Sequence, residues 1–354
     1  MPRLYLVVIA GGSGTRFWPK STSKKPKQLL AFGTESSPHS HSLLAQTLSR
    51  FDHWIPVSQR MIVTTRVLEA AVQAEAGGAR VMAEPQGRNT APCVYWAARA
   101  IAQEDPQGIM LIMPSDHYIA QPDRFIETVK MAAEWASETD DLVTLGIQPT
   151  RPETGYGYLK TSTHPSTQSS QVQKVDAFVE KPNLEKATSF LQAGNYLWNG
   201  GMFIWKVSTI LNAFDRYMPE MKQIWDSSSG NVEQAYPKMP ATSIDYGIME
   251  KASNVVSFPL NCGWDDLGSW TSLDNLASEL HAQKDGNVVT AGDLLAIDSI
   301  NNIVDAPKRF VSLLGVKDLI IVEQGDAILV AHKSQAQEIR RIVDEAKKRR
   351  PDLT

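Results

Sequence analysis

Short apolar runs alternate with amphipathic stretches over residues 4–150 of this chain. Five runs have the length and composition of strands that are apolar on both faces, and the stretches between them show helical periodicity. This alternation is typical of an α/β fold, in which helices cover a mostly parallel sheet and ligands bind at the carboxyl ends of the strands. The predicted strands are 4–10, 60–65, 79–84, 108–114 and 141–147, and the predicted helices are 42–51, 90–104 and 123–139.

The next region, residues 151–282, has a more mixed pattern. Two β-rich runs, 156–162 and 172–181, are predicted to form antiparallel strands. The polar segment 163–171 between them is predicted to be a surface loop. We assign this region, with the preceding alternation, to one large domain over residues 1–282.

The chain after residue 285 consists of short β-rich runs separated by Gly, Asp and Pro, which indicates a small all-β unit. It closes with a predicted helix that Ser334 and Gln337 would cap. We therefore predict a second domain over residues 283–354. Its runs are 287–291, 294–298, 301–306, 310–315, 319–324 and 327–332.

The composition argues against nucleic acid or an anionic membrane as the main ligand. Hydrophobic residues make up 42% and charged residues 21%, with a formal net charge of -4. The basic run 347–350 ends a predicted helix, where it complements the helix dipole. The apolar run 4–10 is too short to span a bilayer, and no signal-peptide cleavage pattern follows it.

The two cysteines, Cys93 and Cys262, lie far apart in the sequence and show no metal-binding spacing. This usage is typical of a protein in a reducing compartment without disulfides. We therefore predict a cytoplasmic protein without a zinc site.

The first predicted strand leads directly into a glycine-rich loop, Gly11-Gly12-Ser13-Gly14. Glycine permits unusual φ angles and has no Cβ, so such a loop brings backbone N–H groups close to a ligand, for which phosphate is the expected choice. The P-loop pattern is absent, and the dinucleotide fingerprint needs a glycine where Phe17 stands. The alternative to a phosphate site is that the glycines form only a tight turn, followed by a solvated basic loop.

Five cationic side chains follow these glycines, namely Arg16, Lys20, Lys24, Lys25 and Lys27. Arginine can fork across two phosphate oxygens, whereas lysine acts as a compact point charge. A glycine loop next to movable cations suits a polyphosphate ligand.

Seven motifs occur in a fixed order within residues 4–275, namely GGSGTRFWPKS, PKQLL, RNTAP, MPSDH, FVEKP, WNGGMFIW and GWDDLGSW. In this order they resemble the sugar-nucleotide pyrophosphorylases, and within that family the enzymes that make GDP-mannose. An ordered set is far more specific than any single motif. The resemblance implies a Rossmann-like nucleotidyltransferase domain with a mixed, mostly parallel sheet, and a β-helix-like C-terminal unit. The C-terminal runs show no clean hexapeptide repeat, so a role in oligomer packing is the alternative.

The reaction that the resemblance implies is Mg²⁺-dependent transfer of GMP from GTP to α-D-mannose 1-phosphate, with release of pyrophosphate. A sugar-phosphate oxygen attacks the α-phosphorus directly, so the protein must bring two anions together and stabilise the leaving group. Mg²⁺ prefers oxygen ligands, and the resemblance assigns it to Asp116 and Asp266, with Asp265 as the competing carboxylate. Lys20, Lys24 and Lys25 are expected to be solvated neighbours. The catalytic residues implied are Arg16, Lys27, Asp116, Lys181 and Asp266.

Glu84 lies at the end of a predicted strand, where related enzymes contact the base. Guanine presents N1–H and its 2-amino group as adjacent donors and a carboxylate accepts both, so we hypothesise that Glu84 selects guanine. Asn89 and Thr90 begin the next predicted helix, and they either contact the nucleotide or only cap the helix. The nucleotide-binding residues implied are Gly11, Gly12, Ser13, Gly14, Thr15, Arg16, Lys27, Glu84, Asn89, Thr90, Ser115 and Asp116.

The sugar phosphate is assigned by the same resemblance to four residues. Glu180 and Lys181, at the end of a predicted strand, would bind sugar hydroxyls and the phosphate, unless they form only a solvated strand end. Asn199 offers an amide for the hydroxyls, and Gly157 lets the backbone approach the sugar.

Two rival functions stay open. One is a pyrophosphorylase for another sugar, such as glucose 1-phosphate, or another base, such as thymine. The other is a regulatory subunit that binds GDP-mannose without turnover, which we expect to lack some of the catalytic set, whereas all five residues are present. Longer relatives carry a fused isomerase domain with a His/Glu metal set that is absent here, so isomerase activity is not implied. Family members commonly dimerise, so we expect a homodimer.

Overall fold

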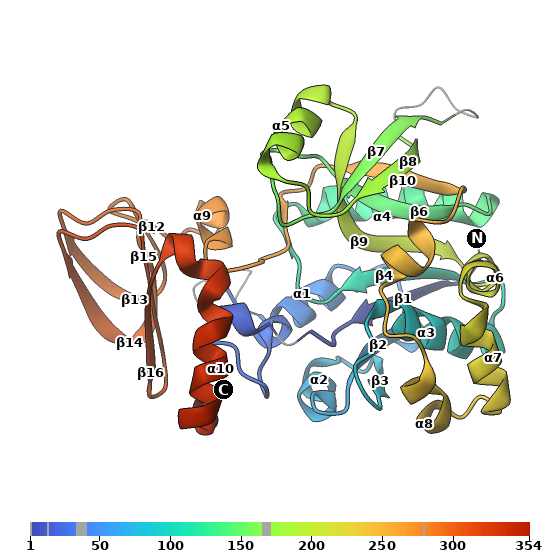
Figure 1. Ribbon diagram of the computed structural model, residues 1–354, viewed down its shortest axis with the longest axis horizontal. Helices are drawn as coiled ribbons and strands as arrows, with labels where there is room; N and C mark the ends of the chain where they lie inside the picture. The colour runs from blue at the N-terminus through green and yellow to red at the C-terminus, as the bar shows by residue number, and fades with distance from the viewer. Residues whose placement is uncertain (1, 13, 33–40, 165–170, 279) are drawn as a thin grey trace.

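The computed structural model describes residues 2–354 except 13, 33–40, 165–170 and 279. Figure 1 shows a large α/β unit beside a smaller β unit, with the last long helix packed against the N-terminal part of the α/β unit. Most of the predicted loop 163–171 falls outside the described residues. No described helix is both long and apolar enough to cross a membrane.

The α/β unit is built on a nine-stranded sheet in the order β3-β2-β1-β4-β9-β6-β10-β8-β7. Strands β8 and β9 run opposite to the other seven, so the sheet is mixed and mostly parallel, as predicted. All five strands predicted before residue 150 are present, with ends shifted by at most one residue. The strands are β1 Leu4–Ile9, β2 Arg60–Thr65, β3 Arg80–Glu84, β4 Ile109–Pro114, β6 Leu142–Ile147, β7 Tyr158–Thr163, β8 Gln173–Val179, β9 Tyr196–Lys206 and β10 Val255–Leu260.

Helices cover both faces of this sheet, and each face has its own apolar core. On one face, α1, α2 and α4 bury residues such as Leu44, Val72 and Phe125 against the strands. On the other face, α3, α6 and α7 do so with residues such as Val94 and Phe214. The helices are α1 Leu43–Ser49, α2 Glu69–Glu75, α3 Thr90–Glu104, α4 Pro122–Glu138, α5 Leu184–Ala193, α6 Val207–Tyr217, α7 Pro219–Ser227 and α8 Val232–Ala235.

The C-terminal unit is a five-stranded sheet in which β13, β14 and β15 pair in parallel and the two outer strands pair antiparallel. The all-β unit is present, but its six β-rich runs are not six separate strands, because four of them join into the two long strands β13 and β14. At the first join, Gly292 has φ +93° and a Cβ there would lie 2.1 Å from the Ala306 carbonyl oxygen, so glycine forms a bulge inside a strand rather than a turn. The strands are β12 Gln283–Lys284, β13 Asn287–Ile297, β14 Ile303–Leu314, β15 Leu319–Gln324 and β16 Ala327–His332.

The final helix α10, Ile339–Arg349, begins later than predicted. Ser334 does not cap it, because its backbone N–H and its hydroxyl both contact His332 Nδ1, and residues Lys333–Glu338 form a 3₁₀ turn instead. Lys347 and its two basic neighbours lie in the last turn, where they face the negative end of the helix dipole, as predicted.

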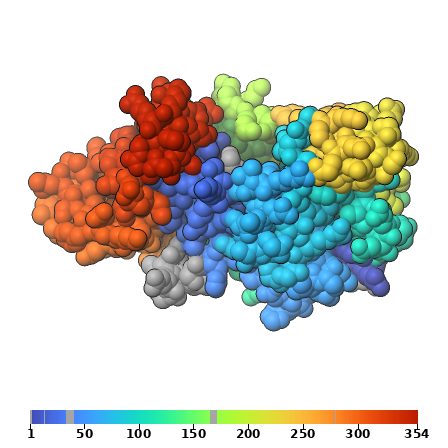
Figure 2. All heavy atoms as spheres, turned by 90° about the horizontal axis from the view of Figure 1, so that it is seen from below, coloured from blue at the N-terminus to red at the C-terminus, as the bar shows by residue number. Residues whose placement is uncertain are grey.

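A third apolar core joins the two units. Phe17 and Trp18, which follow the glycine loop, pack there with Trp270, Ile320 and Ile339. Figure 2 shows the C-terminal helix lying directly against the N-terminal segment of the α/β unit. Two further elements complete the connection between the units. They are the short helix α9, Ser272–Leu276, and a small two-stranded antiparallel sheet of β5, Tyr118–Ile119, with β11, Trp264–Asp265.

Candidate functional site

Two adjoining cavities open at the carboxyl ends of β1, β3 and β4, with volumes of about 650 and 290 Å³. Asp116, His117 and Asp266 line both cavities and therefore mark their junction. Apart from the competing carboxylate Asp265, every candidate residue that the structure describes lines one cavity or the other, and Ser13 lies outside the described residues. The larger cavity holds Gly11, Gly12, Glu84, Asn89, Thr90, Ser115, Gly157, Glu180, Lys181 and Asn199, and the smaller holds Gly14, Thr15, Arg16 and Lys27.

The glycine loop closes tightly against the segment that carries Lys27. Gly14 has φ +57°, and a Cβ there would lie 2.5 Å from the Lys27 backbone nitrogen, so both conformation and contact require glycine. Gln28 Nε2 donates to the carbonyl oxygens of Ala10 at 2.8 Å and Gly12 at 3.0 Å. Gln28 therefore fixes the path of the loop, a role that sequence reasoning missed.

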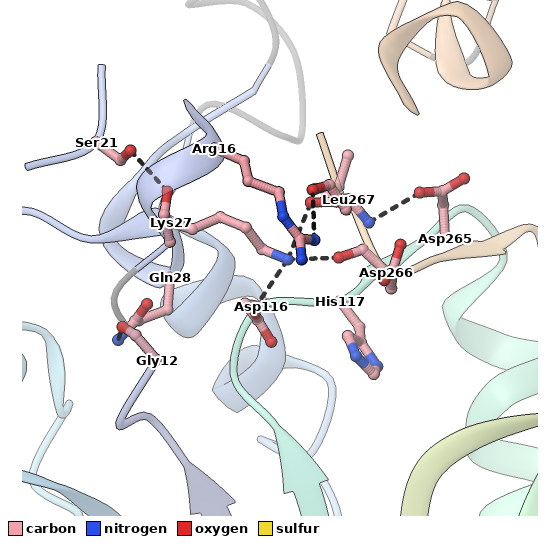
Figure 3. Close-up of polar contacts among 12 residues, drawn as sticks. Gly12, Arg16, Ser21, Lys27, Gln28, Asp116, His117, Asp265, Asp266 and Leu267 are labelled. Atoms are coloured by element: carbon pink, nitrogen blue, oxygen red, sulfur yellow. Dashed lines mark hydrogen bonds and ion pairs between the residues drawn. The ribbon is translucent and has the colours of Figure 1, made fainter. Parts of the chain in front are cut away.

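Lys27 is the central cation of the junction (Figure 3). The residue is 7% exposed, and its ammonium lies 2.9 Å from Asp116 Oδ2. It also donates to the carbonyl oxygen of Leu267 at 3.1 Å and to that of Asp266. Arg16 reaches the same segment, where its Nη1 donates to the Gly268 carbonyl oxygen at 3.1 Å. Lys27 thus joins the glycine loop, the end of β4 and the GWDDLG segment.

The groups around Lys27 have opposite tendencies to ionise. Burial alone would raise the pKa of Asp116, but the charge of Lys27 and its hydrogen bond to this carboxylate outweigh burial and hold the pKa below its ordinary value. Burial lowers the pKa of His117 to about 4, so its ring is neutral at pH 7. Trp264 Nε1 donates to His117 Nδ1 at 3.1 Å. The junction therefore presents an ionised carboxylate beside a neutral imidazole.

The two adjacent aspartates of GWDDLG point in different directions. Asp266 lines both cavities, and its Oδ1 accepts a hydrogen bond from the Tyr156 hydroxyl at 2.8 Å. Asp265 is 2% exposed and lines neither cavity. Its Oδ1 accepts from the Leu267 backbone N–H at 2.8 Å, and its Oδ2 lies 3.7 Å from Arg151 Nη2. Of the two competing carboxylates, Asp266 is the one that faces the cavities.

One end of the larger cavity is built around Glu84, which is 5% exposed at the end of β3. Tyr236, 152 residues away in the sequence, donates its hydroxyl hydrogen to Glu84 Oε1. Burial raises the pKa of Glu84 to about 7, although this hydrogen bond acts to lower it. Nearby, Asn89 Oδ1 accepts from the Thr90 N–H at 2.8 Å, which is the capping role left open above.

The other end of the larger cavity collects polar groups from the two residues after β8, from β9 and from a short π-helix, Asp245–Met249. Lys181 Nζ lies 2.6 Å from Glu180 Oε1, and a Cβ on Gly157 would lie 2.7 Å from Glu180 Oε2. Asn199 Nδ2 donates to Asp245 Oδ1 at 2.7 Å. Burial raises the pKa of Asp245 above its ordinary value.

Sequence reasoning missed Tyr156, Tyr236 and Asp245, all of which contact candidate residues. Tyr156 stands beside Gly157 in a stretch predicted as a strand, so the sequence held a local signal for it. Tyr236 and Asp245 come from segments without a recognised motif, and only the fold brings them to the cavity.

Comparison with known proteins identifies the family. Residues 5–283 match the family model for nucleotidyl transferase, and residues 292–346 match that for the MannoseP isomerase/GMP-like beta-helix domain. The chain is 34% identical to the mannose-1-phosphate guanylyltransferase of Escherichia coli (strain K12), with 98% of this chain and 74% of that protein covered. The chain belongs to the mannose-1-phosphate guanylyltransferase family of nucleotidyl transferases.

Other members of this guanylyltransferase family match over similar lengths. The mannose-1-phosphate guanylyltransferase of Salmonella montevideo is 35% identical, with 96% of this chain and 73% of that protein covered. A crystal structure described as mannose-1-phosphate geranyltransferase from Thermus thermophilus superposes with a TM-score of 0.88, at 32% identity and with 98% and 99% of the two chains covered. The expected nucleotidyltransferase fold with a β-helix-like C-terminal unit is therefore confirmed, and the chain is a nucleotidyltransferase enzyme.

Proposed function

We propose that this chain transfers GMP from GTP to α-D-mannose 1-phosphate and forms GDP-mannose and pyrophosphate. The relatives that carry this name match nearly the whole chain, and the observation that carries the proposal is the cation and carboxylate group of Lys27, Asp116 and Asp266 at the junction of two cavities. An oxygen of mannose 1-phosphate attacks the α-phosphorus. The bond from that phosphorus to the bridging oxygen breaks, and pyrophosphate leaves with the electron pair.

The side chains of the junction suit this displacement, which needs no protein nucleophile. Lys27 and Arg16 would bind the triphosphate and offset the negative charge that develops on pyrophosphate. Glu84 would accept from guanine at one end of the larger cavity. At the other end, Glu180 and Asn199 would hold the sugar hydroxyls and Lys181 the sugar phosphate. The two reacting groups would then meet between fixed ends.

We propose Mg²⁺ as the cofactor, held by Asp116 and Asp266. Both carboxylates line both cavities, and an ionised carboxylate is the hard oxygen ligand that Mg²⁺ prefers. Among the residues that the structure describes, no group of three or more His, Cys, Asp or Glu side chains could hold a metal alone. Mg²⁺ usually takes one or two carboxylates and fills its other positions with substrate phosphates and water. When bound, Mg²⁺ polarises phosphoryl oxygens as a Lewis acid.

Base selection is tested by replacing Glu84 with Gln. The amide keeps one acceptor but turns its NH₂ toward a guanine donor, so we expect kcat/KM for GTP to fall about 100-fold. The preference for GTP over ATP and dTTP should shrink with it. The measurement is initial rates with the three nucleotides. The matched variant Glu180→Gln should instead raise KM for mannose 1-phosphate and keep the base preference, and an unchanged preference in Glu84→Gln would reject the hypothesis.

GTP binding should weaken as the pH falls below 7. The pKa of Glu84 is raised to about 7 by burial, so at lower pH the free protein holds a proton there, whereas guanine needs the ionised carboxylate. The association constant should therefore fall about tenfold per pH unit below 7 and level off above it. Calorimetric titration with GTP from pH 5.5 to 8.5 measures this, with Glu84→Gln as the control for titration of the triphosphate itself. A wild-type profile identical to that of the variant would exclude the effect.

The whole proposal is tested by pyrophosphate release from four nucleoside triphosphates crossed with mannose, glucose and galactose 1-phosphates. We expect the highest kcat/KM for GTP with mannose 1-phosphate, and only in the presence of Mg²⁺. A different preferred pair would point to the rival substrate. Binding of GDP-mannose without turnover of any pair would point to a regulatory subunit.

We propose a homodimer. In support, Leu295, Ile297 and Leu314 expose apolar side chains on β13 and β14, and Ile297 pairs in register with Leu314. Exposed apolar groups that lie together mark association sites. Ile297→Glu should shift sedimentation toward the monomer, and a monomeric wild-type protein would contradict the proposal.

A further inference from the structure

A buried ion pair ties the glycine loop to the C-terminal β unit. Lys20 Nζ donates to Asp305 Oδ2 at 2.6 Å, and Thr290 Oγ1 donates to the same oxygen at 2.7 Å. The side chain of Asp305 is completely buried in β14 and that of Lys20 is 19% exposed. The expectation that Lys20 is a solvated neighbour was therefore wrong, because its ammonium neutralises a buried carboxylate 285 residues away in the sequence.

The segment between Gly14 and Lys20 is tightly connected by hydrogen bonds. The Phe17 N–H donates to the Gly14 carbonyl oxygen at 3.2 Å, and the Ser21 N–H donates to that of Phe17 at 3.0 Å. Ser21 Oγ also donates to the Gly14 carbonyl oxygen at 2.7 Å. A shift of Lys20 would therefore move the end of the loop that carries Gly14 and the next residues.

The C-terminal unit holds the same segment at a second point. Trp18 Nε1 donates to the Leu353 carbonyl oxygen at 2.9 Å. From the α/β unit, Trp270 Nε1 also donates to the Trp18 carbonyl oxygen at 3.3 Å. Neither Lys20 nor Asp305 lines either cavity at the junction. Any effect of this ion pair on the reaction must therefore pass through the loop.

We propose that Asp305 is a positioning residue for the triphosphate: by fixing Lys20, it sets the place of Gly14 and Arg16 in the smaller cavity. The inference rests on the proposed function, in which these two residues bind GTP. It gives the C-terminal β unit a part in nucleotide binding within its own chain, besides any part in dimer formation.

The test compares wild type with the double variant Lys20→Met, Asp305→Leu. Replacing both partners leaves no unpaired buried charge, so the fold should persist with a similar Tm. The ion pair that holds Lys20 against β14 is lost, however. We expect KM for GTP to rise about tenfold and KM for mannose 1-phosphate to stay unchanged. Lys20→Arg should keep the ion pair and the wild-type KM. Lys24→Met, which removes an exposed cation from the same loop, is the matched control.

Two further measurements keep the inference testable if the double variant fails to fold. Asp305→Asn keeps the size and the acceptor but removes the charge, and should raise KM for GTP by a smaller factor. Amide hydrogen exchange of residues 14–21 should become faster in both variants. A folded variant with wild-type KM for GTP and wild-type exchange would overturn the inference. Failure of the proposed function would instead be seen in the wild-type protein, as an absence of pyrophosphate release from GTP and mannose 1-phosphate.

Discussion

Replacing Lys27 with Met should lower kcat/KM for GTP by about 10³-fold. The ammonium is almost fully buried and contacts the Asp116 carboxylate and two carbonyl oxygens, so no other described side chain makes this set of contacts. Without it, repulsion between the triphosphate and the junction carboxylates is uncompensated. The measurement is steady-state pyrophosphate release with GTP and mannose 1-phosphate.

Two variants separate charge from geometry at this position. Lys27→Arg keeps the charge, but a longer, planar guanidinium cannot reproduce the contacts of a compact ammonium with the three surrounding oxygens, so it should restore little activity. Lys24→Met removes a solvent-exposed cation from the same loop and should stay within about threefold of wild type. If Lys27→Met retained a tenth or more of the wild-type kcat/KM, Lys27 would not be the central cation of the reaction.

The second large effect is expected at Asp266, one of the two adjacent aspartates. Asp266→Asn should lower kcat by about 10³-fold, because it removes a negative charge that faces both cavities and would hold Mg²⁺. The amide can still accept from the Tyr156 hydroxyl, so the change of shape is small. The measurement is kcat as a function of Mg²⁺ concentration at saturating GTP.

The same substitution one residue earlier is the matched control. Asp265→Asn keeps the acceptor for the Leu267 N–H, and burial already raises the pKa of this carboxyl, so loss of the charge costs the fold little. We expect kcat within about threefold of wild type. Equal losses in the two variants would mean that the orientation of Asp266 toward the cavities does not decide its role.

The predictable part of the fold lay in the parallel strands. Strands such as β1 and β4 are buried on both faces, so they read as continuous apolar runs with clear ends. Strand β9 crosses the middle of the sheet antiparallel to β4 and β6, but Asn199 and two glycines interrupt its apolar pattern. At Gly292 the sequence pattern indicated the end of a run, although this glycine lies inside the long strand β13. A glycine inside a strand resembles a turn until its contact with Ala306 is known.

The candidate site also has residues that the sequence could place and residues that it could not. Glu84 ends one predicted strand and Asp116 follows another. Because the carboxyl ends of parallel strands meet at one edge of a sheet, the sequence placed the two residues near one another. The partners that orient the site could not be predicted, because they are distant in sequence. Tyr236 meets Glu84 across 152 residues, and Lys20 meets Asp305 across 285.

The central claim is that Asp116 and Asp266 hold one metal ion where the nucleotide and the sugar phosphate meet. A crystal structure with GDP-mannose and Mn²⁺, which gives an anomalous signal, tests it directly. We expect a single anomalous peak in contact with both carboxylates and with a phosphate of the ligand. A peak bound to neither aspartate, or separate ions on the two, would contradict it.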